Sequence, residues 1–219
     1  MRRSARILGI HRVTVARKKQ FIASQSRIEQ SQFLQKFKVT PVTEVQFDDI
    51  ETFEHTKYKP LSITLAVTPE RHILGFKVSR MPAKGHLAEE SRQKYGIRRD
   101  QRRKALTELL TSLKEVVDDK ALFRTDQNPL YPSPLRTVFP NATHETCLGR
   151  RGCIVGQGEL KKIPWDPLFS LNHTAAMLRA NINRLFRRTW CTTKVPERLS
   201  EHLDIYVSFH NRVLLAEAS

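Results

Sequence analysis

The segment of residues 122–131, Leu-Phe-Arg-Thr-Asp-Gln-Asn-Pro-Leu-Tyr, constrains the fold of this chain more than any other. A short apolar run ends at Thr125 and Asp126, and Pro129 then opens a new segment. This pattern predicts a buried strand that delivers one carboxylate to the carboxyl edge of a sheet, where ligands of open α/β sheets gather. Since proline is tolerated at a first helical position, the alternative role of Asp126 is to cap a following helix.

The elements around this segment follow a definite order. Three β-rich runs come first, and helical spacing of leucines and valines then predicts an amphipathic helix before the Asp126 strand. A fifth strand and two amphipathic helices close the chain. The predicted strands are 42–53, 61–67, 72–78, 121–125 and 142–147, the hairpin turn is 68–71, the first helix is 100–117, and the last helix starts at Pro196. Residues 79–100 and 148–162 are predicted to be polar, basic loops.

This order predicts an α/β fold of the ribonuclease H-like kind, a mixed five-stranded sheet flanked by helices. In that layout the first and fourth strands are neighbours, so Asp48 and Asp126 converge although they are distant in sequence. Neighbouring strand residues point to opposite faces, so only one of Asp48 and Asp49 faces the site. We favour Asp48. The alternative is that both acids are edge or turn charges.

A third polar side chain, Asn172, opens the first of the late helices. Two carboxylates and one amide oxygen meet the minimum that Mg²⁺ needs, because this cation takes a few hard oxygen ligands and keeps waters and substrate phosphate for the rest. We therefore expect Asp48, Asp126 and Asn172 to be catalytic residues that bind two Mg²⁺ (or Mn²⁺) ions. The alternative for Asn172 is an ordinary helix N-cap, a role that asparagine favours.

The charge balance points to a polyanionic partner. The chain has 38 Lys and Arg against 22 Asp and Glu, a net charge of +16, and such an excess favours nucleic acid first. No apolar run approaches the ~18 residues of a membrane span. The three cysteines are sparse and include no C-x-x-C pair. This argues against a disulfide framework or a structural zinc site and favours a reduced, cytoplasmic protein associated with the nucleoid.

The first 36 residues predict a DNA-binding segment. Residues 1–27 contain eight Lys or Arg and no acid. Ala5, Gly9 and Val15 stand where a helix-turn-helix needs a small residue, a turn glycine and a buried apolar residue, which makes 11–21 the recognition helix. The helix that usually precedes these two is missing, which indicates a truncated domain. Residues 22–36 extend the recognition helix or form a linker, and an organellar transit peptide is the alternative for the basic start.

Basic side chains outside this segment add to the expected DNA contacts. Arg179 lies seven residues after Asn172, nearly two helical turns, so it shares that face of the helix. A guanidinium there can hold a phosphate by two parallel hydrogen bonds. The candidate contacts to double-stranded DNA are Arg12, Arg17, Lys18, Arg98, Arg99, Arg102, Arg103 and Arg179.

Three blocks of the sequence resemble bacterial insertion-sequence transposases of the insertion-sequence-one type and their relatives. The blocks are residues 45–49, 125–131 and 172–194, and Thr-Asp-x-x-Pro-Leu-Tyr is the most specific of them. The resemblance covers about residues 42–212. It implies a catalytic domain, here 42–215, that acts as a DDE-type nuclease and strand transferase with Mg²⁺. Asp48 and Asp126 match the two aspartates of the family, and Asn172 stands where most members carry glutamate and some related groups carry asparagine.

Three functions compete on these grounds. The first is a transposase that binds element ends and target DNA as a homo-oligomer, cleaves a strand and transfers its 3′ end. The second is a catalytically inactive or remnant DNA-binding protein on the same scaffold. The third is a nuclease or resolvase for branched or hybrid nucleic acid, because a fold alone does not determine a function.

Overall fold

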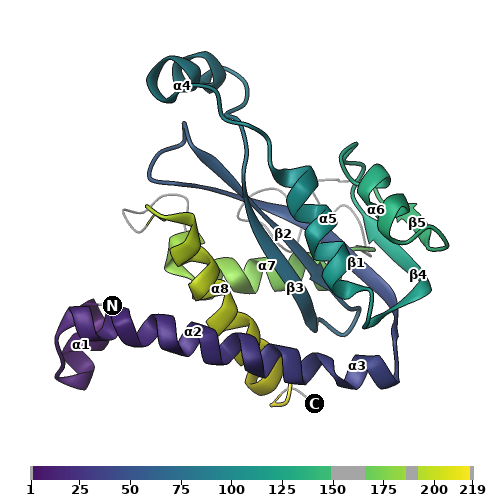
Figure 1. The fold of residues 1–219 in the computed structure, drawn as a ribbon, viewed down its shortest axis with the longest axis horizontal. Helices are drawn as coiled ribbons and strands as arrows, with labels where there is room; N and C mark the ends of the chain where they lie inside the picture. Colours follow the sequence, from purple (N-terminus) through teal and green to yellow (C-terminus); the bar gives the residue numbers. More distant parts are fainter. Residues whose placement is uncertain (1, 149–165, 186–191, 218–219) are drawn as a thin grey trace.

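The sheet is mixed and five-stranded. The structure, a computed structural model, describes residues 2–148, 166–185 and 192–217, and its strand order is β3-β2-β1-β4-β5 (Figure 1). An antiparallel meander is formed by β1 (Val42–Phe53), β2 (Pro60–Val67) and β3 (Ile73–Arg80). β4 (Val117–Thr125) pairs in parallel with β1, and β5 (Thr143–Thr146) pairs in parallel with β4. The ribonuclease H-like fold is confirmed. The predicted loop at 148–162 lies, apart from Leu148, outside the described residues.

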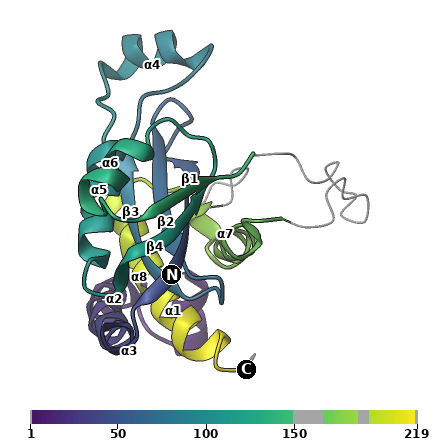
Figure 2. The ribbon, with the colours of Figure 1, turned by 90° about the vertical axis from the view of Figure 1, so that its right-hand side faces the viewer.

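Helices cover both faces of this sheet. Side chains alternate along β1, so Val45 and Phe47 pack against α5 (Arg102–Leu113) and α6 (Pro132–Val138), and Ile50 packs on the other face against α7 (Phe169–Asn181) and α8 (Pro196–Phe209). Figure 2 shows α5 and α6 on one side of the sheet and α7 on the other. The predicted apolar positions of β1 are therefore core residues. The short helices η1 (Asn183–Leu185) and η2 (His210–Leu214) follow α7 and α8.

The N-terminal residues form the two predicted helices. α1 (Arg2–Leu8) and α2 (Arg12–Leu34) meet at Gly9, whose φ of 62° is the left-handed conformation that favours glycine. Ala5 is buried and Val15 is half-buried. Because α2 runs unbroken to Leu34, the residues after 21 extend the helix and are not a linker. The short α3 (Lys36–Val39) then leads into β1. Recognition of DNA by α2 stays a prediction.

Ion pairs join α2 to α8. Lys19 forms a buried ion pair with Glu201 at 2.6 Å, and Arg27 pairs with Asp204 at 2.5 Å. Burial lowers the pKa of Lys19, and the hydrogen bond that Lys19 donates to Glu201 opposes that shift. α2 thus lies along the body of the fold (Figure 1).

The prediction of a loop at 79–100 is wrong over its middle, where α4 (Leu87–Tyr95) projects away from the sheet (Figure 1). This helix is polar and lacks an apolar stripe, so periodicity does not reveal it. Contacts with the turn after β1 hold it instead. The Ser91 hydroxyl donates to the Tyr58 carbonyl at 2.6 Å, and the Lys59 ammonium lies 4.4 Å from the Tyr95 ring centroid.

Two boundaries differ for local reasons. α6 begins at Pro132, not at Pro129, because residues 128–131 form a turn in which Asn128 Oδ1 accepts from the Leu130 amide at 3.1 Å. The last helix leaves regular α-geometry after Phe209, and Val213, which lies beyond that point, is 36% exposed. Among the described helices, none is long and apolar enough to cross a membrane.

Candidate active site

Asp48 and Asp126 come together through the pairing of β1 with β4. In this parallel pair Val45 lies opposite Phe123, and Gln46 lies opposite Arg124. Two residues further along each segment stand Asp48 and Asp126. Since neighbouring strands are ~4.8 Å apart, the two carboxylates share one edge of the sheet. The negative charge of Asp126 contributes to the raised pKa of Asp48, as expected for carboxylates on neighbouring strands.

The Asp48 carboxylate is held in place and largely buried. Its Oδ1 accepts from the Asp49 amide at 2.6 Å and from the Tyr131 hydroxyl at 2.9 Å. Burial raises the pKa of Asp48 to about 6, the two hydrogen bonds oppose the shift, and the charge of Asp126 adds to it. Among the described residues, no ion pair neutralises Asp48 or Asp126.

Asp126 does not cap α6. Its Oδ1 accepts from the Asn128 amide at 2.9 Å and closes a turn, whereas the N-cap of α6 is Tyr131. The alternative role considered from the sequence is therefore wrong. The turn fixes Asp126 at the carboxyl end of β4.

Asp49 points to the other face of β1. The Thr64 hydroxyl donates to its Oδ1 at 2.6 Å. Burial raises the pKa of Asp49, and the hydrogen bonds of Thr64 and Ser62 and the charge of Arg102 lower it. Alternation along β1 thus separates the two acids, and Asp48 is the one beside Asp126.

The first turn of α7 is docked onto β1 by one side chain. Gln46 Nε2 donates to the Pro167 carbonyl at 3.3 Å, and Gln46 Oε1 accepts from the Leu171 amide at 3.3 Å. Gln46 shares the face of β1 that Asp48 presents, two residues away. The segment that carries Asn172 therefore begins next to the aspartate pair.

Asn172 is exposed and hydrogen-bonded to an acid that sequence reasoning missed. Its Nδ2 donates to Asp166 Oδ2 at 2.8 Å. The N-cap position of α7 is Leu168, and Asn172 lies three residues inside the helix, so the N-cap role is wrong. In the described part of the chain, no three His, Cys, Asp or Glu side chains form a metal-binding group. The candidate site therefore consists of the two carboxylates of Asp48 and Asp126, and Asn172 lies on the helix that Gln46 joins to β1.

The predicted DNA-contacting residues fall into two groups. Arg98 donates to the carbonyls of Met81 and Pro60, and Arg102 pairs with Asp100 at 2.6 Å, each with a side chain only 13% exposed. These contacts favour a structural part for both residues. The other six are exposed, and their contact with DNA stays a prediction: Arg12, Arg17, Lys18, Arg99, Arg103 and Arg179.

Three further side chains on this edge were not anticipated. The only sequence signal for Gln46 is its place two residues before Asp48, on the same face of the strand. The only signal for Tyr131 is its place in the most specific sequence block. Arg124, also on that face, is clamped by Glu44 at 2.5 Å and Glu145 at 3.0 Å. The charge of Arg124 is thus neutralised by these two glutamates and not by the aspartate pair.

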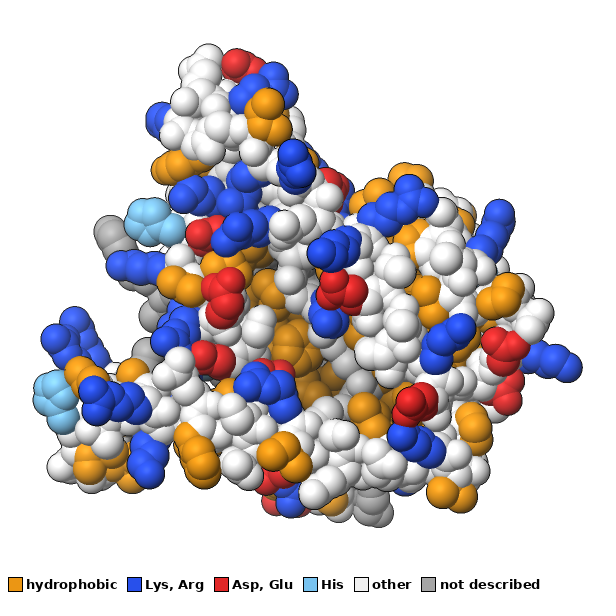
Figure 3. Space-filling model, viewed as in Figure 1, with side chains coloured by type: hydrophobic (Ala, Val, Ile, Leu, Met, Phe, Trp, Pro, Cys, Tyr) orange, Lys and Arg blue, Asp and Glu red, His pale blue; other side chains and the backbone are white. Residues whose placement is uncertain are grey.

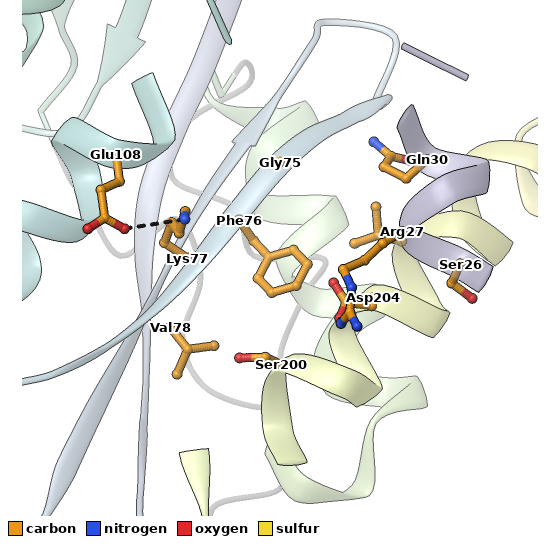
Figure 4. Close-up of a pocket in the computed structure, with 11 residues that line it drawn as sticks. Ser26, Arg27, Gln30, Gly75, Phe76, Lys77, Val78, Glu108, Ser200 and Asp204 are labelled. Carbon is orange, nitrogen blue, oxygen red and sulfur yellow. Dashed lines mark hydrogen bonds and ion pairs between the residues drawn. The ribbon is translucent and has the colours of Figure 1, made fainter. Parts of the chain in front are cut away.

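A groove of about 480 Å³ lies elsewhere, between β3, α2, α5 and α8. Figure 3 shows it as an apolar hollow, and Figure 4 shows the side chains that line it. The two acids that line the groove are in ion pairs, since Glu108 pairs with Lys77 at 3.3 Å and Asp204 pairs with Arg27. None of Asp48, Asp126 and Asn172 lines this groove, so it is separate from the candidate site.

Comparisons with known proteins include a distant structural likeness. No family profile matches the chain, and no curated protein matches it in sequence. A chain of the simian T-cell lymphotropic virus intasome in complex with PP2A regulatory subunit B56 gamma is similar, with a TM-score of 0.40 and 14% identity. The match covers 79% of this chain and 49% of the viral chain, so this chain spans about half the length of that relative.

We expect Asp48→Asn to stabilise the metal-free protein at neutral pH. A rise in pKa from 3.8 to about 6 corresponds to roughly 3 kcal/mol that ionised Asp48 costs the folded state. This cost is absent well below pH ~4, where the carboxyl is protonated in both states, grows between about pH 4 and pH 6, and is fully present above that window. Thermal melts in chelator should show a gain of roughly 5–10 °C at pH 7. An equal gain at pH 4 would contradict the electrostatic cause.

Proposed function

We propose that this chain is a transposase of the DDE type, with asparagine as its third polar residue, which cleaves and transfers DNA strands. The observation that carries the proposal is the convergence of Asp48 and Asp126 at one sheet edge without a neutralising cation from the described residues. Structural carboxylates are usually paired when buried. A carboxylate whose pKa is raised by burial and by a like charge beside it, as that of Asp48 is, is typical of a functional site.

The side chains present fit divalent cations. Carboxylate and amide oxygens are hard ligands of the kind that Mg²⁺ and Mn²⁺ prefer. Asp48 and Asp126 would hold two such ions, with Asn172 as a neutral ligand. When bound, the ions would activate the attacking oxygen and stabilise the leaving oxygen of a phosphodiester.

The residues around the ligands have positioning tasks. The Tyr131 hydroxyl and the Asp49 amide fix the orientation of the Asp48 carboxylate. The turn to Asn128 fixes Asp126, and Gln46 would hold the start of α7, and with it Asn172, against β1. Such restraint matters because catalytic geometry must be held closely for efficient reaction.

The proposed partner is double-stranded DNA, at both element ends and target, bound by a homo-oligomer. The net charge of +16 and the exposed arginines and lysines of α1, α2 and α5 support this. An inactive scaffold that only binds DNA is the alternative.

A strand-cleavage and joining assay tests the proposal. The protein is incubated with supercoiled plasmid and a labelled oligonucleotide duplex, with Mg²⁺, Mn²⁺ or chelator. A transposase nicks DNA only with metal and joins the labelled 3′ end to plasmid. Nicking without joining would favour a nuclease or resolvase, and binding without nicking under any metal would favour the inactive scaffold.

A further inference from the structure

We infer that Asp166 is a positioning residue for Asn172, holding the amide so that its oxygen is presented to the candidate cation site. The inference rests on the proposed function. The contact that carries it is the hydrogen bond from Asn172 Nδ2 to Asp166 Oδ2, 2.8 Å long. An amide can present either its oxygen or its N–H groups, and only the oxygen can bind a cation. A carboxylate accepts hydrogen bonds only from the NH₂ end of the amide, so its position determines the direction in which the amide oxygen points.

Asp166 is itself fixed. Its Oδ1 accepts from the Leu168 amide at 3.0 Å, and its backbone carbonyl accepts from the Phe169 amide at 3.0 Å, which ties it to the start of α7. One carboxylate oxygen is therefore used at the helix start and the other holds Asn172. Among the described residues, no protein donor is bonded to Asn172 Oδ1, so that oxygen is available.

The surroundings place this pair beside the face of β1 that carries Asp48. Gln46, on the Asp48 face of β1, bonds to Pro167, the residue after Asp166. The Cys147 amide bonds to the carbonyl of Thr125, which precedes Asp126, at 2.8 Å. Burial raises the pKa of the Cys147 thiol, and the charges of Glu145 and Asp166 contribute to that rise. Asp166 thus lies within electrostatic reach of the end of β4.

The arrangement also supplies charge. Asn172 is neutral, so a site made of it and two aspartates carries less negative charge than one with three carboxylates. Asp166 stands behind the amide and polarises it through the hydrogen bond, which makes the oxygen a better ligand. The pair thus combines a neutral ligand with a charged partner.

The Asp166→Asn variant tests this arrangement because it keeps the bond to the helix start. Its Oδ1 can still accept from the Leu168 amide, but its NH₂ group then faces Asn172. The Asn172 amide must turn to accept, which withdraws its oxygen. We expect the affinity for Mn²⁺, followed by electron paramagnetic resonance of the free ion, to fall roughly tenfold, the lower end of the usual effect of such partners.

The exchange variant Asp166→Asn with Asn172→Asp separates positioning from folding. Asn172→Asp alone places two carboxylates at hydrogen-bond distance and should lower the melting temperature of the metal-free protein. The exchange restores a single donor and a single acceptor. We expect it to recover both the melting temperature and an Mn²⁺ affinity at least equal to that of the parent chain.

A matched control exists at the other end of β4, where Asn141 Nδ2 donates to Asp119 Oδ2. Asp119→Asn and its exchange with Asn141→Asp should leave Mn²⁺ affinity unchanged. Unchanged affinity in Asp166→Asn, with a parent that binds Mn²⁺, would overturn the positioning role and leave the proposed function standing. A parent chain that binds no Mn²⁺ would overturn both.

Discussion

Asp126→Ala should lower Mg²⁺-dependent strand cleavage at least about a thousandfold while DNA affinity stays the same or rises slightly. Loss of a metal ligand removes several kcal/mol of transition-state stabilisation, and about 4 kcal/mol corresponds to this factor. Removing the carboxylate also removes a repulsion towards phosphate. Cleavage of supercoiled plasmid and a binding titration of the same preparation measure the two effects.

Asp118→Ala is the matched control. Asp118 Oδ1 accepts from the Lys120 amide at 2.8 Å, the same local bond that Asp126 makes to Asn128, but at the start of β4. Each substitution should cost about 1 kcal/mol of folding stability through that lost bond. Only the Asp126 variant should lose cleavage. Equal cleavage by the two variants would remove Asp126 from the site.

DNA affinity should fall on the order of 10³ between 50 and 200 mM salt. Six exposed residues remain candidates for phosphate contacts, and about six such contacts give a loss of this size through counterion release. A fluorescence anisotropy titration at several salt concentrations gives the slope. Affinity that is insensitive to salt would contradict the nucleic-acid interpretation.

Arg17→Ala and Arg98→Ala divide this effect. Arg17 is exposed on α2, so its replacement by alanine should lower the slope of log affinity against log salt concentration by about 1. Arg98 is bonded to Met81 and Pro60 carbonyls and to Glu54. Its removal should lower the melting temperature and leave the slope unchanged.

The sheet and the aspartate pair could be predicted because their signals are local. A β-rich run in the sequence marks each strand, and the order of strands and helices restricts the topology to a few arrangements. Asp48 and Asp126 then converge by register alone. Alternation along β1 predicts only that one of Asp48 and Asp49 faces the site. The pairing of β1 with β4 and the bond from Thr64 to Asp49 identify Asp48 as the one beside Asp126.

The supporting contacts could not be predicted because they depend on tertiary packing. The Tyr131 hydroxyl reaches Asp48 across two segments, and the bond from Asn172 to Asp166 runs back past the start of α7. α4 was not predicted because it is a polar helix held by contacts with Tyr58 and Lys59. No periodic pattern in the sequence records such contacts.

The location of the metal tests the central claim most directly. Fe²⁺ can replace Mg²⁺ at carboxylate sites, and with ascorbate and peroxide it generates hydroxyl radicals that cut the polypeptide close to the ion. Mass spectrometry of the fragments then maps the site without any need for DNA or turnover. We expect cuts in β1 near Asp48 and after β4 near Asp126, suppressed by excess Mg²⁺ and absent in Asp126→Ala. Cuts confined to other segments, or cuts near Asp48 that persist in Asp126→Ala, would contradict a cation shared by the two aspartates.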